Sequence, residues 1–125
     1  MNSNKIQSHR DLIVWRKAMD MSVQVYELAE SFPKTETYRL TSQITRSAVS
    51  VPANIAEGHA RSTKKDYANF LAIAKGSLME TETFVMLAVR LKYISQIQAN
   101  PTLSIITEIS KMLTALRNRL LQTSK

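Results

Sequence analysis

Apolar residues recur along most of the chain at intervals of three and four positions, which is the spacing of one face of an α-helix. The pattern predicts four helices, which run from Asp11 to about Ser31, from Glu36 to about His59, over roughly 28 residues from Thr63, and from about Thr102 to Gln122. No segment shows the alternation of a β-strand. Four helices with short connections predict an all-α fold, an antiparallel up-down-up-down four-helix bundle.

Four side chains suit the starts of these helices. Asp11 is expected to cap the first helix and Thr35 the second, because short polar side chains accept hydrogen bonds from the free N–H groups of a first turn. Thr63 and Asp66 form a pair like a capping box at the start of the third helix, with aspartate in the place of the usual Glu or Gln.

Proline and glycine mark the ends of the predicted helices. Pro33 stops the first helix, because proline disfavours helical geometry in the residue before it. Gly58 can take the left-handed conformation that ends the second helix. Asn100-Pro101 is a turn signal ahead of the last helix.

Pro52 lies inside the second predicted helix. Proline removes the hydrogen bond to the carbonyl of Ala48 and crowds that group, so the segment can either break into two helices or form one kinked helix. The apolar period from Leu40 to Ile55 continues through the proline without a change of phase. The continuous period favours one kinked helix.

Gln43, Asn54 and Glu57 are unusual polar residues for a packed helix, and we interpret them as a structural polar network. Buried amides and carboxylates must be hydrogen-bonded. These three side chains can satisfy the carbonyl that Pro52 frees, or cross-link helices and fix their register. The alternative is that they line a ligand pocket. The structural interpretation is favoured, because a freed carbonyl needs a partner and polar register devices are well attested.

The 125 residues are expected to form one bundle domain over residues 11–122, with a flexible N-terminal tail at 1–10 and a C-terminal tail at 123–125. Cysteine is absent, which excludes disulfides and thiolate metal sites. No apolar run approaches the roughly 20 residues that span a bilayer. The polar N-terminus does not resemble a secretory signal. We therefore expect a cytoplasmic protein that does not associate with membranes.

The chain has a formal net charge of +7, and the excess is concentrated near the C-terminus. Residues 90–125 hold six Lys or Arg against the single acid Glu108. Such a surplus favours a polyanionic partner, RNA or DNA, although many basic proteins bind no nucleic acid.

Basic residues are expected to gather at one end of the bundle, where the first and third helices start and the second and fourth end. The predicted nucleic-acid-binding residues are Arg16, Lys17, Arg61, Lys64, Lys65, Arg117 and Arg119. Part of this charge can serve only to match the negative C-terminal ends of helices. Aromatic residues are few and mostly in phase with the core, so binding should be led by phosphate contacts and depend weakly on sequence.

Motifs of common enzyme sites are missing. His9 and His59 form no H-x-x-x-H pair, and there is no E-x-x-H motif for a di-metal site. The chain has no G-x-S-x-G elbow, no glycine-rich phosphate loop and no cysteine nucleophile. We expect a protein that is not an enzyme and that holds no metal or cofactor.

A second, weaker apolar flank accompanies the main stripe on two of the helices. Its members are Val14, Val23 and Leu28 in the first helix and Ile105, Met112 and Leu121 in the last. An isolated bundle needs one stripe per helix, so the flanks suggest a homo-oligomer in which another subunit covers part of the surface. Single exposed apolar residues are also normal on monomers.

The run from Ser50 to Gly58 reads S-V-P-A-N-I-A-E-G. It resembles the signature S-I-P-x-N-I-A-E-G of the four-helix-bundle proteins named after the 23S rRNA intervening sequence, a family that includes the accessory variability proteins of diversity-generating retroelements. The resemblance extends over nearly the whole chain; Leu12, Val14, Trp15 and Ala18, for example, match the opening L-x-V-W-x-x-A of the family.

Two positions depart from the family pattern. Thr45 stands where the family often has the first of two arginines, which removes part of a basic surface. Lys92 stands where the family often has the glycine of a Leu-Gly-Tyr sequence, which suggests a different C-cap for the third helix.

The resemblance implies a homopentameric barrel and two functional possibilities. In the first, the protein is the accessory protein of a diversity-generating retroelement and binds its reverse transcriptase and template RNA. In the second, it is a stand-alone oligomeric scaffold of the intervening-sequence type, without a dedicated nucleic-acid partner. The basic charge balance favours the first.

Overall fold

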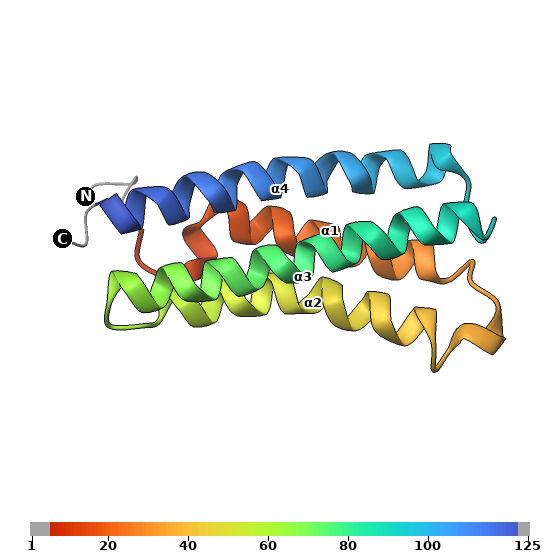
Figure 1. The fold of residues 1–125 in the computed structure, drawn as a ribbon, viewed down its shortest axis with the longest axis horizontal. Helices are drawn as coiled ribbons and strands as arrows, with labels where there is room; N and C mark the ends of the chain where they lie inside the picture. The colour runs from red at the N-terminus through yellow and green to blue at the C-terminus, as the bar shows by residue number, and fades with distance from the viewer. Residues whose placement is uncertain (1–5, 123–125) are drawn as a thin grey trace.

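A computed structural model describes residues 6–122 of the chain. These residues form α1 (Ile13–Ala29), α2 (Leu40–His59), α3 (Lys64–Arg90) and α4 (Gln96–Gln122), with short 3-10 helices η1 (His9–Asp11) and η2 (Lys34–Glu36), and no strand. Consecutive helices run in opposite directions (Figure 1), which confirms the predicted antiparallel four-helix bundle. The tail residues 1–5 and 123–125 lie outside the described part.

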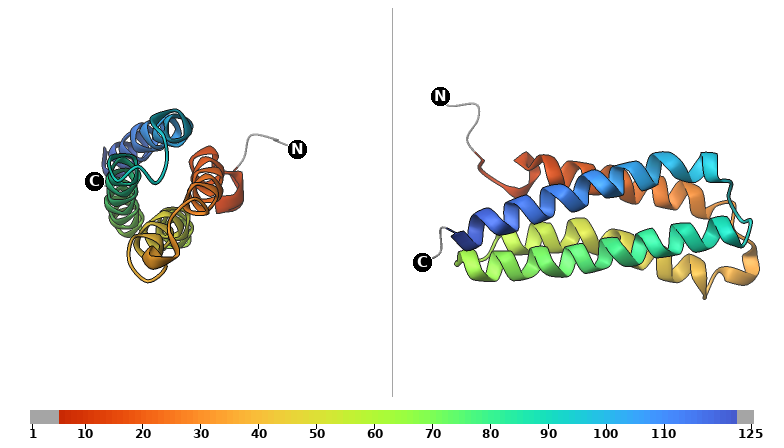
Figure 2. Two further views of the ribbon diagram at one scale, coloured as in Figure 1. Left: turned by 90° about the vertical axis from the view of Figure 1, so that its right-hand side faces the viewer. Right: turned by 45° about the horizontal axis from the view of Figure 1, so that its top comes forward.

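The helices surround one axis in the order α1, α2, α3, α4 (Figure 2), and each packs against the helices before and after it, with α4 closing back onto α1. Their apolar stripes meet along this axis. The largest fully buried side chains include Met21, Ile44, Leu71, Leu78, Ile106 and Leu113. Each such aliphatic side chain contributes about 1.5–3 kcal/mol relative to an exposed one, so the stripe supplies most of the stability of the bundle.

Asp11 does not cap α1, contrary to the expectation from the sequence. It belongs to η1, where its carboxylate accepts hydrogen bonds from the backbone N–H groups of Gln7 and Ser8 at 2.9 and 3.2 Å. These bonds lower the pKa of Asp11. The N-cap of α1 is Leu12, whose side chain makes no capping bond. The predicted tail at 1–10 therefore contains a regular turn at its C-terminal end.

α2 begins at Leu40 and not at Glu36, and Thr35 caps no helix, because residues Lys34–Glu36 form η2. The Glu36 carboxylate accepts hydrogen bonds from the Leu40 N–H at 3.2 Å and from the Tyr93 hydroxyl at 2.7 Å. The Tyr93 hydrogen bond is the main reason that the pKa of Glu36 is lowered, and the same bond raises the pKa of Tyr93. Glu36 thus joins the α1–α2 loop to the α3–α4 loop.

Gly58 has a role different from the predicted one. It does not have a positive φ, and α2 continues to His59. A Cβ at this position would lie 2.7 Å from the Cβ of Phe70 and 3.2 Å from the carbonyl oxygen of Tyr67. Glycine is needed here because α3 passes too close for any side chain.

The left-handed helix end is found at Lys92, which follows the C-cap Leu91 of α3 and has a φ of 65°. The N–H of Tyr93 donates to the carbonyl of Ala88, and the N–H of Lys92 donates to that of Val89, both at 3.0 Å. This is the Schellman pattern that a glycine usually completes. The expectation of a different C-cap is therefore wrong: the cap is kept, and a lysine adopts the conformation.

At the start of α3, Thr63 caps the helix as predicted, accepting a hydrogen bond from the Asp66 N–H at 3.1 Å. α4 differs from the prediction, because it begins at Gln96 and includes Pro101. Ser95 and Gln98 exchange backbone-to-side-chain hydrogen bonds at 2.8 and 3.1 Å, which is the geometry of a capping box. These bonds start the helix upstream of the proline.

α2 runs through Pro52 as one helix, as predicted. The carbonyl of Ala48, which has no N–H partner at position 52, accepts a hydrogen bond from the Ser22 hydroxyl of α1 at 3.1 Å. The same hydroxyl also lies 3.0 Å from the carbonyl of Ala18. Ser22, Ala48 and Pro52 are all buried, so a carbonyl without a partner would be costly here. The freed carbonyl is therefore satisfied across the α1–α2 interface.

We predict that Ser22→Ala lowers the free energy of unfolding by about 1–3 kcal/mol, because it leaves the buried Ala48 carbonyl without a donor. In a Pro52→Ala background the new backbone N–H supplies that donor, so the same substitution should have a smaller effect. Urea denaturation of the four proteins at one fixed protein concentration measures this coupling. An equal loss in both backgrounds would show that the Ala48 carbonyl does not depend on Ser22.

The two glycines provide a matched pair of substitutions. Gly58→Ala should destabilise the protein by about 1–3 kcal/mol, because its Cβ is forced against Phe70. Gly76→Ala should stabilise it by about 0.5–1 kcal/mol, because nothing lies within 4 Å of the added Cβ and alanine is the better helix former. Denaturation curves measured side by side test both signs. A similar loss at both positions would contradict the close approach of α2 and α3.

Candidate nucleic-acid interface

The end of α2, the start of α3 and the end of α4 lie at one end of the bundle, whereas α1 starts further in (Figure 1). This arrangement divides the seven predicted basic residues. Arg61, Lys64, Lys65, Arg117 and Arg119 come from the elements that share the end. Arg16 and Lys17 come from α1.

The two α1 residues have partners of their own. Arg16 donates its Nε–H to the carbonyl oxygen of Arg10 at 2.9 Å. The Lys17 Nζ forms an ion pair with a carboxylate oxygen of Glu108 on α4 at 2.7 Å. Glu108 precedes Arg119 by 11 residues, or about 16 Å of helix. The structure therefore sets Lys17 apart from the basic end and pairs it with an acid.

Arg61, Lys64 and Lys65 flank the turn between α2 and α3. Arg61 lies 3.6 Å from a carboxylate oxygen of Glu57, and its guanidinium stacks 4.6 Å from the ring centroid of Phe70. Lys64 and Lys65 are exposed in the first turn of α3. An exposed pair such as Arg61 with Glu57 is weak and is screened by salt. Arg61 remains accessible to a phosphate.

Arg117 and Arg119 tie the end of α4 to the start of α3. Arg117 donates its Nε–H to the backbone carbonyl of Ala68 at 3.2 Å and is half-buried. Burial raises the pKa of Tyr67, and the nearby positive charge of Arg119 acts in the opposite direction. Five of the seven predicted residues thus lie around the connection between α2 and α3 and the C-terminal end of α4. The acids among them are Asp66 and Glu57.

Of the three predicted network residues, only Asn54 takes part in a polar contact between helices, and it does so through Ser50. Its Nδ2 donates to the carbonyl and to the hydroxyl of Ser50 at 2.8 and 2.9 Å, and the Ser50 and Ser77 hydroxyls are 2.9 Å apart. Gln43 and Glu57 are exposed and have the local partners Arg46 and Arg61. The carbonyl freed by Pro52 is bonded to Ser22 and to none of these three side chains.

Further hydroxyls complete the polar contact between α2 and α3. The Thr81 hydroxyl donates to the Ser47 hydroxyl at 2.9 Å, and Ser47 in turn donates to the carbonyl of Ile44 at 3.0 Å. In the described residues no buried side-chain nitrogen or oxygen lacks a partner. The apolar period does not predict these hydroxyl pairs, because short hydroxyl side chains are tolerated on either face of a helix.

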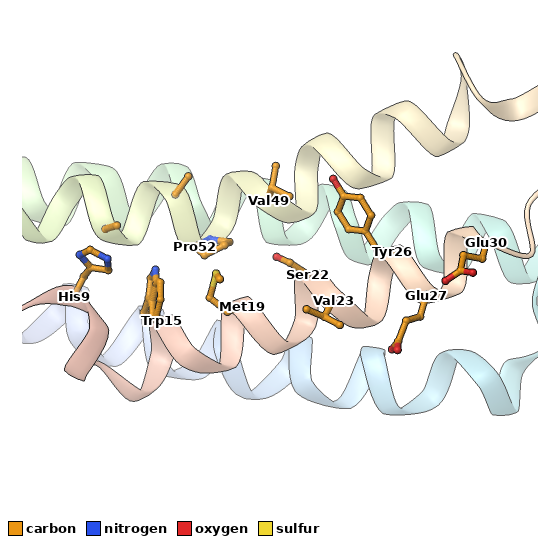
Figure 3. Close-up of a pocket in the computed structure, with 12 residues that line it drawn as sticks. His9, Trp15, Met19, Ser22, Val23, Tyr26, Glu27, Glu30, Val49 and Pro52 are labelled. Carbon is orange, nitrogen blue, oxygen red and sulfur yellow. The ribbon is translucent and has the colours of Figure 1, made fainter.

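An apolar groove of about 530 Å³ runs between α1 and α2 (Figure 3). Trp15, Met19, Val23 and Tyr26 line it from α1, and Val49 lies opposite on α2. Figure 3 shows the two helices diverging beyond Val49, toward the end at which Glu27 and Glu30 lie. Val23 is 58 % exposed and Tyr26 52 %, so a large part of the groove faces solvent. Of the predicted apolar flank on α1, only Val23 lines the groove, whereas Val14 belongs to the buried core.

Residues 6–122 offer no group of three or more acidic or histidine side chains that could hold a metal ion. Within the same range, none of the helices combines the length and the apolar character required to cross a membrane.

Lys75 is a basic residue that the sequence interpretation missed. Its Nζ donates to the Thr114 hydroxyl of α4 at 2.6 Å, in a groove that also contains Arg117. The available signal was that Lys75 borders the buried stripe of α3, next to Ala74, where a charged residue is unusual. Spacing along the sequence does not show that Lys75 faces the side of α4 that carries Arg117.

Comparisons with known proteins agree with this architecture. The family model for the 23S rRNA-intervening sequence protein matches residues 10–115. A crystal structure from Bacteroides thetaiotaomicron, of a protein of unknown function from the S23 ribosomal protein family, is 29 % identical, with a TM-score of 0.78 over 84 % of this chain and 98 % of that one. No curated protein is significantly similar to the chain.

Proposed function

The chain belongs to the 23S rRNA-intervening sequence protein family, and from this premise we propose that it is a non-enzymatic basic adaptor that binds RNA or DNA through phosphate contacts. The observation that carries the proposal is the charge balance of 17 Lys and Arg against 10 Asp and Glu, together with the gathering of five basic residues where α2, α3 and α4 meet. A surface of this kind attracts a polyanion and releases its counterions.

Phosphate contacts, and not base stacking, are expected to dominate. The aromatic rings at the basic end already have partners: Tyr67 makes an edge contact with His59 at a centroid distance of 5.7 Å, and Phe70 lies under Arg61. A ring engaged in this way has less of its surface left for stacking with an unstacked base. Binding should therefore depend little on sequence.

The more specific form of the proposal is an accessory role in a diversity-generating retroelement, in which the protein binds a reverse transcriptase and its template RNA. The competing possibility is a stand-alone oligomeric scaffold without a dedicated nucleic-acid partner. The apolar groove supports such a scaffold, because it suits a contact between copies and involves no nucleic acid. The gene neighbourhood separates the two. A reverse transcriptase gene with a template repeat beside this gene supports the first, and its absence favours the scaffold.

A homo-oligomer, with a pentamer as the expected form, is part of the proposal. The groove between α1 and α2 is one unpartnered apolar surface. On α3, Ile73 and Met86 are also exposed, both at 51 %, but they lie 13 residues apart on different sides of the helix. Exposed apolar side chains outside the groove allow a contact between different surfaces of two copies, and such a head-to-tail contact forms a ring when its rotation closes.

We predict a solution mass of about five times 14.2 kDa by light scattering at micromolar concentration. Val23→Lys, which places a charge in the α1–α2 groove, should lower this mass. Ile97→Lys is the matched control, because Ile97 is 82 % exposed at the start of α4 and outside the groove. A monomeric wild-type protein would contradict the assembly, and equal effects of the two substitutions would contradict the use of the groove.

We predict that the logarithm of the affinity for RNA or DNA falls linearly with the logarithm of the salt concentration. Changing Lys64 and Lys65 together to Ala should weaken binding to all sequences about equally, and should reduce the slope for single strands by about 1.4, as expected for two lost phosphate contacts. Changing Lys34 and Lys92 to Ala, in the loops at the other end, is the control of equal charge.

Fluorescence anisotropy with labelled oligonucleotides measures both slopes. Absence of binding at low salt would refute nucleic-acid binding. Equal effects of the two lysine pairs would show that binding is not confined to the end at which α3 starts.

A further inference from the structure

A groove of about 240 Å³ lies between α3 and α4, separate from the apolar groove between α1 and α2. Lys75, Gly76 and Met79 line it from α3, and Thr114, Arg117 and Asn118 line it from α4. Its volume is several times the roughly 30 Å³ that one water molecule occupies in the liquid. The groove can therefore hold a small polyatomic ion together with water.

Hydrogen-bond donors dominate the polar part of this groove. The Lys75 Nζ uses one of its three N–H donors on Thr114. Arg117 uses its Nε–H on the Ala68 carbonyl, which anchors the guanidinium and leaves the four N–H bonds of its two terminal nitrogens for other acceptors. The Thr114 hydroxyl accepts from Lys75, so its own hydrogen can be donated. The side-chain amide of Asn118 adds two donors.

No carboxylate lines the groove. The ion pairs in residues 6–122 involve neither Lys75 nor Arg117, and Glu82, two helical turns along α3 from Lys75, is not a lining residue. Because Thr114 and Arg117 are three residues apart on α4, their Cβ atoms lie about 5–6 Å from each other, and Lys75 contacts the first of them. Two half-buried cations thus share a small space without a counter-charge.

The structure of α3 leaves this space open. Gly76 lines the groove, and no atom lies within 4 Å of the position that a Cβ would occupy there. Packing inside the monomer therefore does not require glycine at this position, in contrast to Gly58. The missing side chain gives an ion access to the groove beside Lys75.

We propose that the groove between α3 and α4 is a phosphate-binding site in which Lys75 and Arg117 neutralise the anion and Thr114 and Asn118 donate further hydrogen bonds. The proposal rests on the proposed nucleic-acid binding for the source of the phosphate, a phosphodiester of an RNA or DNA strand. The same chemistry accepts a free phosphate ion, and the experiment separates the two sources. Arg117 links the site to the basic end, which gives a strand a continuous path over α3 and α4.

The test compares a groove variant with a control of equal charge. Lys75→Gln with Arg117→Gln removes both cations from the groove. Lys34→Gln with Arg46→Gln removes two exposed cations from η2 and α2. Two further variants guard against a purely structural effect: Lys75→Arg keeps the charge, and Thr114→Glu fills the groove with a carboxylate without removing either cation. Circular dichroism and size-exclusion chromatography show which proteins keep their fold and assembly.

The probes are a labelled 20-nucleotide RNA and inorganic phosphate. We expect RNA affinity to fall at least about tenfold in the groove variant and in Thr114→Glu, and less than about threefold in the control, with Lys75→Arg close to wild type. Addition of inorganic phosphate should shift the backbone NMR signals of residues 75–76 and 114–118 in the wild-type protein and not in Thr114→Glu. If the double groove variant does not fold, Thr114→Glu and Lys75→Arg decide the outcome.

The phosphate-site proposal and the proposed nucleic-acid binding are refuted by different results. If RNA binds but the groove and control variants lose affinity equally, the groove is not a phosphate site, while charge-led nucleic-acid binding stands. If RNA does not bind at low salt but phosphate shifts the groove signals, nucleic-acid binding fails and the site serves a free anion. If neither probe affects the groove, the phosphate site is refuted.

Discussion

The hydrogen bond from the Ser22 hydroxyl to the carbonyl of Ala48 is the contact on which the arrangement of the bundle depends. Pro52 frees that carbonyl inside a buried interface, where an unsatisfied polar group is costly. α1 supplies the missing donor, and α2 continues for two more turns as far as His59. Those two turns place Gly58 under Phe70 and bring α3 in at close range. A chain that broke at Pro52 would not position Arg61 beside the start of α3.

Side-chain hydrogen bonds or ion pairs cross each of the four helix interfaces, and together they set the register of the bundle. Ser22 joins α1 to α2, Thr81 joins α3 to α2 through Ser47, Lys75 joins α3 to α4 through Thr114, and Thr102 joins α4 to α1 through Gln24 at 2.9 Å. Long apolar stripes can slide by a turn with little loss of buried area, whereas a buried polar pair is satisfied in one register only. The same register places Arg117 against the Ala68 carbonyl.

The sequence predicts the number, type and order of the helices because burial of one face imposes a period that extends over many residues. Helix ends were harder to predict, since each depends on few contacts. Pro101 suggested a turn, yet the Ser95–Gln98 capping box starts α4 upstream of it. The basic end follows from topology, but the partners do not: the pairing of Lys17 with Glu108, and the approach of Lys75 to Thr114, depend on how each helix is rotated against its neighbour. A periodic pattern identifies the buried face of a helix, but it leaves the rotation of the helix about its own axis undetermined within tens of degrees.

The apolar groove and the cationic groove lie on different helix pairs. This separation affects how the proposed oligomerisation and the proposed anion binding combine. The apolar groove uses α1 and α2, and the cationic groove uses α3 and α4. Lys75 and Arg117 do not line the apolar groove, so a contact through that groove does not use them on the copy that supplies it. Each added copy then brings one more cationic groove. Sites repeated on one rigid assembly bind phosphates spaced along a single strand with an effective concentration far above that of free sites. In the proposed assembly, a weak anion site on each bundle would then be sufficient for firm binding of a long polyanion, because the assembly multiplies contacts that no single bundle makes.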